Sequence, residues 1–177
     1  MPRTDAVSES SVLLTEYERI KEEQKSRISF RDNLLYFTLA GSAAVLTAES
    51  RTEQPRLLLV IPVISLILGW TYLANDEKIS SAGRYIRDHL EPRLTELVSA
   101  PRPVFGWETY HRHDTGRSSR KRLQTAVDLC TYLLIPAACV TVFLCSSAPP
   151  PPLIAVATAQ LAALGVLGWQ FLRYADL

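Results

Sequence analysis

Long apolar segments alternate with polar ones along this chain. No charged residue occurs between Leu57 and Ala74, and none occurs in the 44 residues from Leu129 to Leu172. A helix in water needs a polar face, so a helix of this length that is apolar on every side is a membrane helix. About 20 helical residues cross a hydrocarbon core of roughly 30 Å. The pattern predicts an all-α integral membrane protein.

We expect four transmembrane helices in two tandem hairpins, with cytoplasmic amphipathic helices before and between them. The spans cover roughly Asn33–Ala48, Leu57–Ala74, Ala126–Ser147 and Leu153–Leu172. The polar turn Glu49–Pro55 joins the first two spans, and the proline run Pro149–Pro152 separates the last two. Pro62 lies in the second span, where we expect a kink, because neighbouring helices can satisfy the carbonyl that a proline leaves without a donor.

The polar segments have a helical periodicity of their own. Apolar residues recur three and four positions apart at Leu13, Tyr17 and Ile20 in the first segment, and at Ile86, Leu90, Leu94 and Leu97 in the central one. Such stripes need an apolar cover, so these residues are candidate contacts for a protein partner or a second copy, unless the two stripes cover each other. The predicted organisation is a disordered N-terminus (1–10), a cytoplasmic amphipathic helix (11–31), a first transmembrane hairpin (32–74), a cytoplasmic helical segment and loop (75–125) and a second transmembrane hairpin (126–177).

The distribution of Lys and Arg predicts the orientation. Six basic residues occur up to Arg31 and ten in residues 75–125, whereas the turn between the first two spans has only Arg51 and Arg56. Basic residues favour the cytoplasmic side, so we expect both termini and the central segment in the cytoplasm and the spans in a bacterial inner membrane. The first thirty residues lack the apolar core of a signal peptide, so the first span is expected to be an uncleaved anchor.

Overall composition changes this picture little. The chain is 47% hydrophobic and 21% charged with a formal net charge of +1, values that would also suit a soluble domain, because averages hide the segregation. A basic cluster directly before the third span can contact anionic lipid head groups, and it consists of Arg117, Arg120, Lys121 and Arg122. As partners we expect the lipid bilayer and either a second copy (a homo-oligomer) or a cytoplasmic protein. Nucleic acid is not expected, because the basic cluster is held at the membrane.

A short motif occurs twice, at the end of the second span and at the end of the fourth. The copies are Leu68-Gly69-Trp70-Thr71-Tyr72-Leu73 and Leu167-Gly168-Trp169-Gln170-Phe171-Leu172. Upstream, Asp32 and Tyr36 loosely echo Asp128 and Tyr132. We interpret the pattern as the duplication of a hairpin. The alternative is convergence, because Gly-Trp is a common choice at a membrane interface.

Little in the sequence points to catalysis. His111, His113 and Asp114, with Glu108 nearby, resemble a metal site, but histidines two positions apart do not share a helix face, so a solvated loop explains them better. The sequence has no phosphate-binding glycine loop and no nucleophile motif. We expect no metal, no cofactor and no enzymatic activity.

A few polar residues lie within the predicted spans. Asp32 and Asp128 each fall in the first turn of a span, where water and head groups reach, so structural anchoring is favoured over a proton or ion relay. Ser65 and Gln160 suit hydrogen bonding between helices. The three cysteines are expected to be small buried apolar side chains and not a disulfide framework, and they are Cys130, Cys139 and Cys145.

Three short sequences carry a resemblance to a known group of proteins. They are Arg31-Asp32-Asn33-Leu34-Leu35-Tyr36, Leu68-Gly69-Trp70 to Glu77-Lys78, and Phe105-Gly106-Trp107-Glu108. Over about residues 15–130 the chain resembles uncharacterised four-span integral membrane proteins of actinobacteria, a resemblance that implies no activity. The architecture is also similar to SLATT-type membrane effector domains, which implies pore formation or membrane perturbation in bacterial conflict systems.

These expectations combine into two hypotheses of different classes. The first is a non-enzymatic bacterial inner-membrane protein that acts as a membrane anchor or scaffold through its cytoplasmic helices. The alternative is a pore-forming or membrane-perturbing effector of an anti-phage system. Both follow from a chain that has membrane helices and polar helices but no group of residues suited to catalysis.

Overall fold

The structure is a computed structural model that describes residues 8–106, 110, 116–146 and 149–174. Within those ranges the regular structure is entirely helical, which confirms the all-α prediction. The chain forms two compact units, the first from residues 1–29 and 76–117 and the second from residues 30–75 and 118–177. The first unit takes in the polar segments, and the second takes in the apolar ones.

Helix α1 (Glu9–Thr52) runs without a break from the first polar segment into the expected first span. It begins two residues before the predicted start, and its acidic first residue favours a helix N-terminus. After the helix, Glu53 adopts a left-handed conformation with a φ of 52°, which stops the helix. The 3-10 helix η1 (Pro55–Leu59) follows and leads into helix α2 (Val60–Tyr85).

Three prolines account for the irregular turns in the helices. Pro62 lies in the first turn of α2, where a missing N–H removes little hydrogen bonding, and the irregular turn, η1, precedes it. Pro92 and Pro136 each lie two residues after a π-turn. A proline ring clashes with the carbonyl four residues before it, and a wider turn relieves the clash. The elements concerned are η2 (Ile86–Leu90), α3 (Glu91–Leu97), α5 (Arg117–Leu129), η3 (Cys130–Leu134) and α6 (Ile135–Cys145).

In the first unit, the two predicted apolar stripes pack against each other. The buried cluster consists of Leu13, Ile86, Leu90 and Leu94, with Tyr17, Ile20 and Phe105 packed at its edge. The rings of Tyr17 and Phe105 stack with 4.0 Å between their centroids. The stripes therefore provide each other's apolar cover, except at Leu97, which is exposed.

Polar contacts add to the pairing of α1 with α2 in this unit. The Gln24 side-chain amide donates to the Ile79 carbonyl at 3.2 Å. The Tyr85 hydroxyl donates to the Glu16 carboxylate at 2.7 Å, and this hydrogen bond raises the pKa of Tyr85. Long polar side chains thus hydrogen-bond across the two helices beside the apolar cluster.

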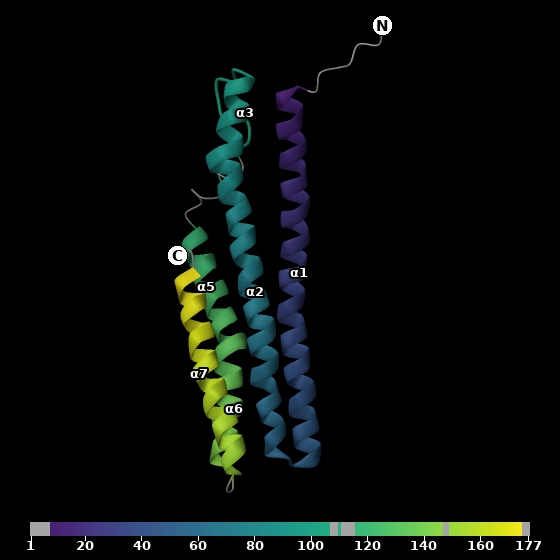
Figure 1. The fold of residues 1–177 in the computed structure, drawn as a ribbon, viewed down its shortest axis with the longest axis vertical. Helices are drawn as coiled ribbons and strands as arrows, with labels where there is room; N and C mark the ends of the chain where they lie inside the picture. Colours follow the sequence, from purple (N-terminus) through teal and green to yellow (C-terminus); the bar gives the residue numbers. More distant parts are fainter. Residues whose placement is uncertain (1–7, 107–109, 111–115, 147–148, 175–177) are drawn as a thin grey trace. The chain divides into compact units, whose positions relative to one another are not determined.

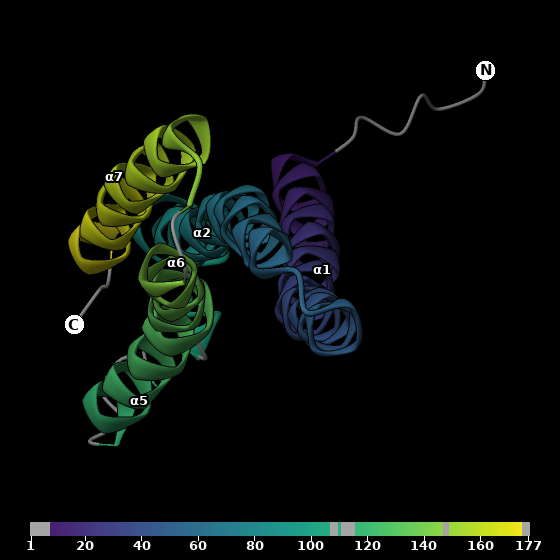
Figure 2. The ribbon, with the colours of Figure 1, turned by 90° about the horizontal axis from the view of Figure 1, so that it is seen from below.

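In the second unit, α2 lies between the C-terminal half of α1 and the helices α6 and α7 (Figures 1 and 2). Helix α7 (Pro151–Tyr174) completes the second hairpin. The seam between α1 and α2 is narrow: Gly41 faces Ile64, and Leu34, Thr38 and Ser42 are buried at successive four-residue steps along α1. Small residues at such a seam let two helices approach closely.

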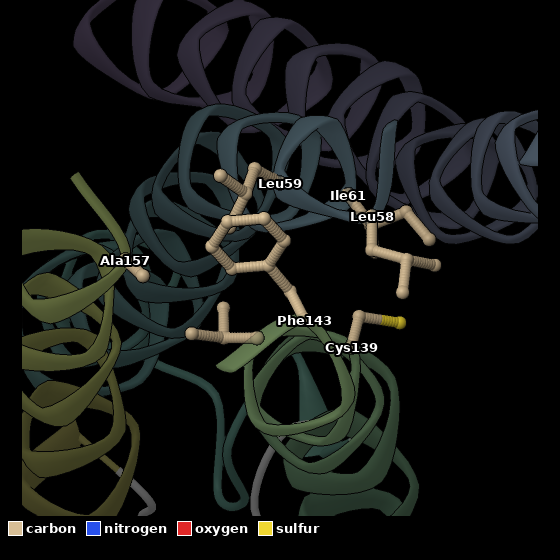
Figure 3. Close-up of a cluster of buried hydrophobic side chains, with 7 residues drawn as sticks. Leu58, Leu59, Ile61, Cys139, Phe143 and Ala157 are labelled. Carbon is tan, nitrogen blue, oxygen red and sulfur yellow. The ribbon is translucent and has the colours of Figure 1, made fainter. Parts of the chain in front are cut away.

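Two apolar clusters fill the interior of the second unit. One joins η1 and α2 to α6 and α7 (Figure 3), and it consists of Leu58, Leu59, Ile61, Cys139, Val140, Phe143 and Ala157. The other lies further along α2 and consists of Leu34, Tyr72, Leu73, Tyr132, Leu167 and Phe171. Each cluster draws side chains from both hairpins, so the two hairpins share one interior.

Among the residues that the structure describes, three stretches form helices that are long and apolar enough to cross a membrane. They are Pro55–Leu97, Ser119–Cys145 and Pro151–Tyr174. In the last of these helices, only 28% of the most apolar 18-residue segment is buried within the protein. The remaining apolar surface needs an apolar solvent, as lipid provides. These features are those of a membrane protein.

Candidate functional site: a polar cluster between the two hairpins

The most unusual side chain in the second unit is the buried carboxylate of Asp128. Asp128 is 7% exposed and accepts a hydrogen bond of 2.8 Å from the Tyr72 hydroxyl. The Gln124 side-chain amide donates to the same hydroxyl at 3.3 Å. Tyr72 comes from α2, whereas Asp128 and Gln124 come from α5. We call these three residues the Tyr72–Asp128 cluster.

Aromatic rings and an arginine surround this cluster. The ring of Tyr132 lies 5.2 Å from that of Tyr72 and 5.7 Å from that of Phe171, between centroids. The Arg31 guanidinium lies over the Tyr72 ring, 5.8 Å from its centroid, and forms an ion pair of 3.2 Å with Asp32. A cation placed over an aromatic face is attracted by the ring's charge distribution. The side chains therefore bring α1, α2, the helix that runs through α5 and η3, and α7 together at one level of the bundle.

The two acidic residues that the sequence singled out have different environments. Asp32 is exposed and pairs with its neighbour Arg31, as expected for a residue that water reaches. Asp128 was expected in a similar wet position, but it is buried and bonded across to another helix. The difference arises because Asp32 points away from α2, whereas Asp128 faces it. The sequence singled out Asp128 but could not identify its partner, since Tyr72 was noted only as an interfacial ring.

A second polar contact joins the hairpins near η1. The Gln160 side-chain amide donates to the Leu59 carbonyl at 2.9 Å. In a 3-10 turn this carbonyl would accept from the residue three positions on, which is Pro62 and has no N–H. Gln160 adds a donor from α7 to this carbonyl, which bears out its expected role in helix packing. The Ser65 hydroxyl and the Gln160 carbonyl oxygen are buried and have no hydrogen-bond partner within the described ranges.

The repeated motif occupies equivalent environments in its two copies. Trp70 and Trp169 are 55% and 57% exposed, and both project outward. Two positions later, Tyr72 and Phe171 are buried and contact each other at 6.1 Å between ring centroids. Both glycines are sites of close approach, Gly69 to the Tyr132 ring and Gly168 to Leu133. The similar residues upstream of the two motifs do not occupy equivalent environments, because Tyr36 is exposed and Tyr132 is fully buried.

The other predicted sites are only partly described. In the basic cluster, Arg120 and Arg122 are exposed on α5, Lys121 is half-buried, and the Arg117 side chain lies outside the described residues. Residues 111–115 and Glu108, which include the two histidines, also lie outside them. Over the part of the chain that the structure describes, no group of three or more potential metal ligands occurs.

The cysteines correct one expectation. Cys139 is buried in the cluster of Figure 3, but Cys130 and Cys145 are exposed on the outer faces of their helices. All three are free thiols. A thiol is a small apolar group, so an outward position suits it in lipid as well as in a protein core.

Cavities border the described residues of the first unit. One, of about 360 Å³, lies between α1 and α2 beside Gln24, Arg27, Lys78 and Tyr85. The other, of about 630 Å³, adjoins α3 and the turn after it, beside Glu91, Thr95, Ser99 and Pro103. Both are open and shallow, and neither contains a nucleophile paired with a base.

The fold and these contacts define a helical membrane protein with a separate polar helical unit. Comparisons with protein-family models, with curated proteins and with solved structures found no match to this chain. Its function therefore has to be argued from its own residues.

Proposed function

We propose that this protein is a non-enzymatic scaffold of the bacterial inner membrane, in which four transmembrane helices anchor a cytoplasmic helical unit that binds a protein. The distribution of basic residues supports the inner-membrane location and cytoplasmic termini. The binding partner is a second copy or a cytoplasmic protein. The basic cluster before the third span contacts anionic lipid head groups in this arrangement.

The first of these four spans is the stretch Asn33–Ala48 of α1. Its 16 uncharged residues rise about 24 Å as a helix, slightly less than the roughly 30 Å of a hydrocarbon core. Large apolar side chains on its outer faces support a lipid environment, among them Tyr36, Phe37, Leu39 and Leu46. A short span is accommodated by local thinning of the bilayer or by flanking side chains that reach the interface.

The observation that carries the scaffold proposal is an exposed apolar patch at the end of α3. Leu97 and Val98 are 46% and 50% exposed, and Val104, after the turn, is 38% exposed. The turn is well formed, since Ser99 has a left-handed φ of 48° and the Val104 N–H donates to the Thr95 hydroxyl. A turn that presents three exposed apolar side chains is suited to contact with another protein.

Site-specific photo-crosslinking in native membranes tests this proposal. A photoreactive residue at Leu97 should give a discrete intermolecular product, whereas one at Glu22, an exposed polar position on α1, should give none. Leu97→Asp should abolish the product formed from a photoreactive residue at Val98, because a desolvated carboxylate disfavours the contact. Intramolecular products alone at Leu97 and Val98 would refute the scaffold proposal.

One observation favours the second candidate, a pore-forming or membrane-perturbing effector. Ser65 is fully buried in the second unit, and neither its hydroxyl nor the carbonyl oxygen of Gln160 has a partner within the described ranges. Unsatisfied polar atoms inside a membrane bundle are costly, and a state that lets water reach them would relieve that cost.

A membrane-potential dye separates the two candidates. Overproduction of an effector should depolarise cells, and Ser65→Ala should weaken the effect by removing one unsatisfied hydroxyl from the interior. Thr158→Ala is the matched control, because Thr158 is exposed and its hydroxyl bonds to its own helix at Ile154. Cells that keep full potential while the protein is abundant would contradict the effector.

A further inference from the structure

We infer that the Tyr72–Asp128 cluster is a latch that holds the second hairpin against α2 and sets how readily the two hairpins separate. The inference concerns the second unit alone and does not depend on the scaffold proposal. Three observations support it: the cost of burying Asp128, the rotation by which the π-turn η3 directs Asp128 toward α2, and the close helix contact at Gly69, which has no counterpart at Asp32.

Burial of the Asp128 carboxylate has an energetic cost. A carboxylate removed from water loses its hydration, and hydrogen bonds recover only part of that loss. A well-packed apolar pair would hold two helices together at least as strongly. What a hydrogen-bonded pair provides instead is a single correct alignment, together with a contact that fails as a unit once either partner is lost. Tyr72 and Asp128 therefore act as a specific contact that can be opened, more than as a general source of stability.

The π-turn η3 keeps the buried residues of the helix that carries Asp128 on one face. Four buried residues follow one another at four-residue steps, and they are Asp128, Tyr132, Pro136 and Val140. In an ideal α-helix four residues turn by about 400°, so three such steps drift by about 120° around the axis. The π-turn η3 contains one residue more per turn and removes about 100° of that drift. It is this turn that keeps Asp128 on the face that meets α2.

A close helix contact at Gly69 lies beside the latch. Gly69 lies one turn before Tyr72 on α2, and a Cβ there would lie 2.9 Å from the Tyr132 ring and 3.0 Å from Leu167. The helices therefore approach closely beside the latch, which places the Tyr72 hydroxyl within reach of Asp128. Asp32 lies at the corresponding place in the first hairpin but makes no such contact, being exposed and paired with Arg31.

Cys139 offers a built-in reporter of hairpin separation. It lies on α6, packs against η1 and is 8% exposed, and the other two cysteines can be replaced by alanine because both are exposed. N-ethylmaleimide enters lipid as well as water, and it can reach this thiol only when the packed side chains move apart, so its rate with Cys139 in native membranes measures how often this interface opens.

In this background, Tyr72→Phe should speed the labelling of Cys139 about tenfold, because a hydrogen bond to a charged group is worth at least that factor in an equilibrium. Asp128→Asn keeps an oxygen that accepts from Tyr72 but removes its charge, so it should speed the labelling by a smaller factor. The matched controls, Tyr36→Phe and Asp32→Asn, make the same chemical changes at exposed positions and should leave the rate unchanged. The double variant Tyr72→Phe/Asp128→Asn should label no faster than Tyr72→Phe alone, because the hydrogen bond that Asp128→Asn weakens is already absent without the Tyr72 hydroxyl.

Two results would overturn the latch. One is an unchanged labelling rate in Tyr72→Phe, a variant that removes a single oxygen atom and leaves the packed ring in place. The other is a double variant whose effect is the product of the two single effects, since that would assign them to unrelated changes in packing. If Asp128→Asn fails to accumulate in the membrane, Tyr72→Phe alone decides the question.

Discussion

At the scale of single residues, the repeated motif shows how one short sequence divides three tasks. Its glycine permits a close helix contact, its tryptophan projects outward, and the aromatic residue two positions later enters the core. Consecutive positions on a helix point about 100° apart, so each residue of the motif meets a different environment. The same structural roles recur at Gly69 and Gly168, and this supports a duplicated hairpin more strongly than the sequence identity of the motif alone.

The glycines of the chain give a prediction at this scale. Gly69→Ala should destabilise the second unit by about 1–3 kcal/mol, because the added methyl group meets the buried Tyr132 ring and overpacks the core. Gly165→Ala is the control: nothing lies within 4 Å of a Cβ there, so the variant should be neutral or slightly more stable. The loss of folded protein on heating in detergent, followed by gel filtration, measures both. Equal melting temperatures would contradict the close approach at Gly69.

At the scale of helices, π-turns and prolines occur together and keep buried stripes aligned. In the first unit, η2 precedes Pro92, and Ile86, Leu90 and Leu94 are buried at four-residue steps. In the second unit, η3 precedes Pro136 in the same way. The sequence reveals the prolines and the four-residue spacing, but not the π-turns, because a wide turn has no residue signature of its own.

At the scale of the whole molecule, the orientation in the membrane is the property that can be tested most directly. We predict that alkaline phosphatase fused after Ser50 or Ser147 is active and that fusions after Thr115 or Leu177 are inactive. The reason is that sixteen basic residues occur up to Arg31 and in residues 75–125, against only Arg51 and Arg56 at the two turns. Lys25, Arg27 and Arg31 adjoin the first span, so this bias does not depend on the long central segment alone. Activity of the Thr115 fusion would show that the orientation is the opposite of the predicted one, with the first unit outside the cytoplasm.

The sequence by itself determined the helical class, the apolar stretches that can cross a membrane and the positions of the polar segments. These properties follow from local composition and periodicity, which every helix carries in its own residues. The sequence also identified the apolar stripes of the first unit, and it left open whether Leu13 and Leu90 meet a partner or each other.

Only the tertiary structure decided which faces meet. It placed Leu13 against Ile86, Leu90 and Leu94 and left Leu97 exposed, and it separated the buried Asp128 from the exposed Asp32 although both occupy the start of a predicted span. The reason is geometric: a π-turn of one extra residue rotates a helix by about 100°, which is enough to move a carboxylate from lipid head groups to the hydroxyl of Tyr72. Contacts between residues that lie 56 positions apart in the chain depend on such rotations, and local sequence patterns do not encode them.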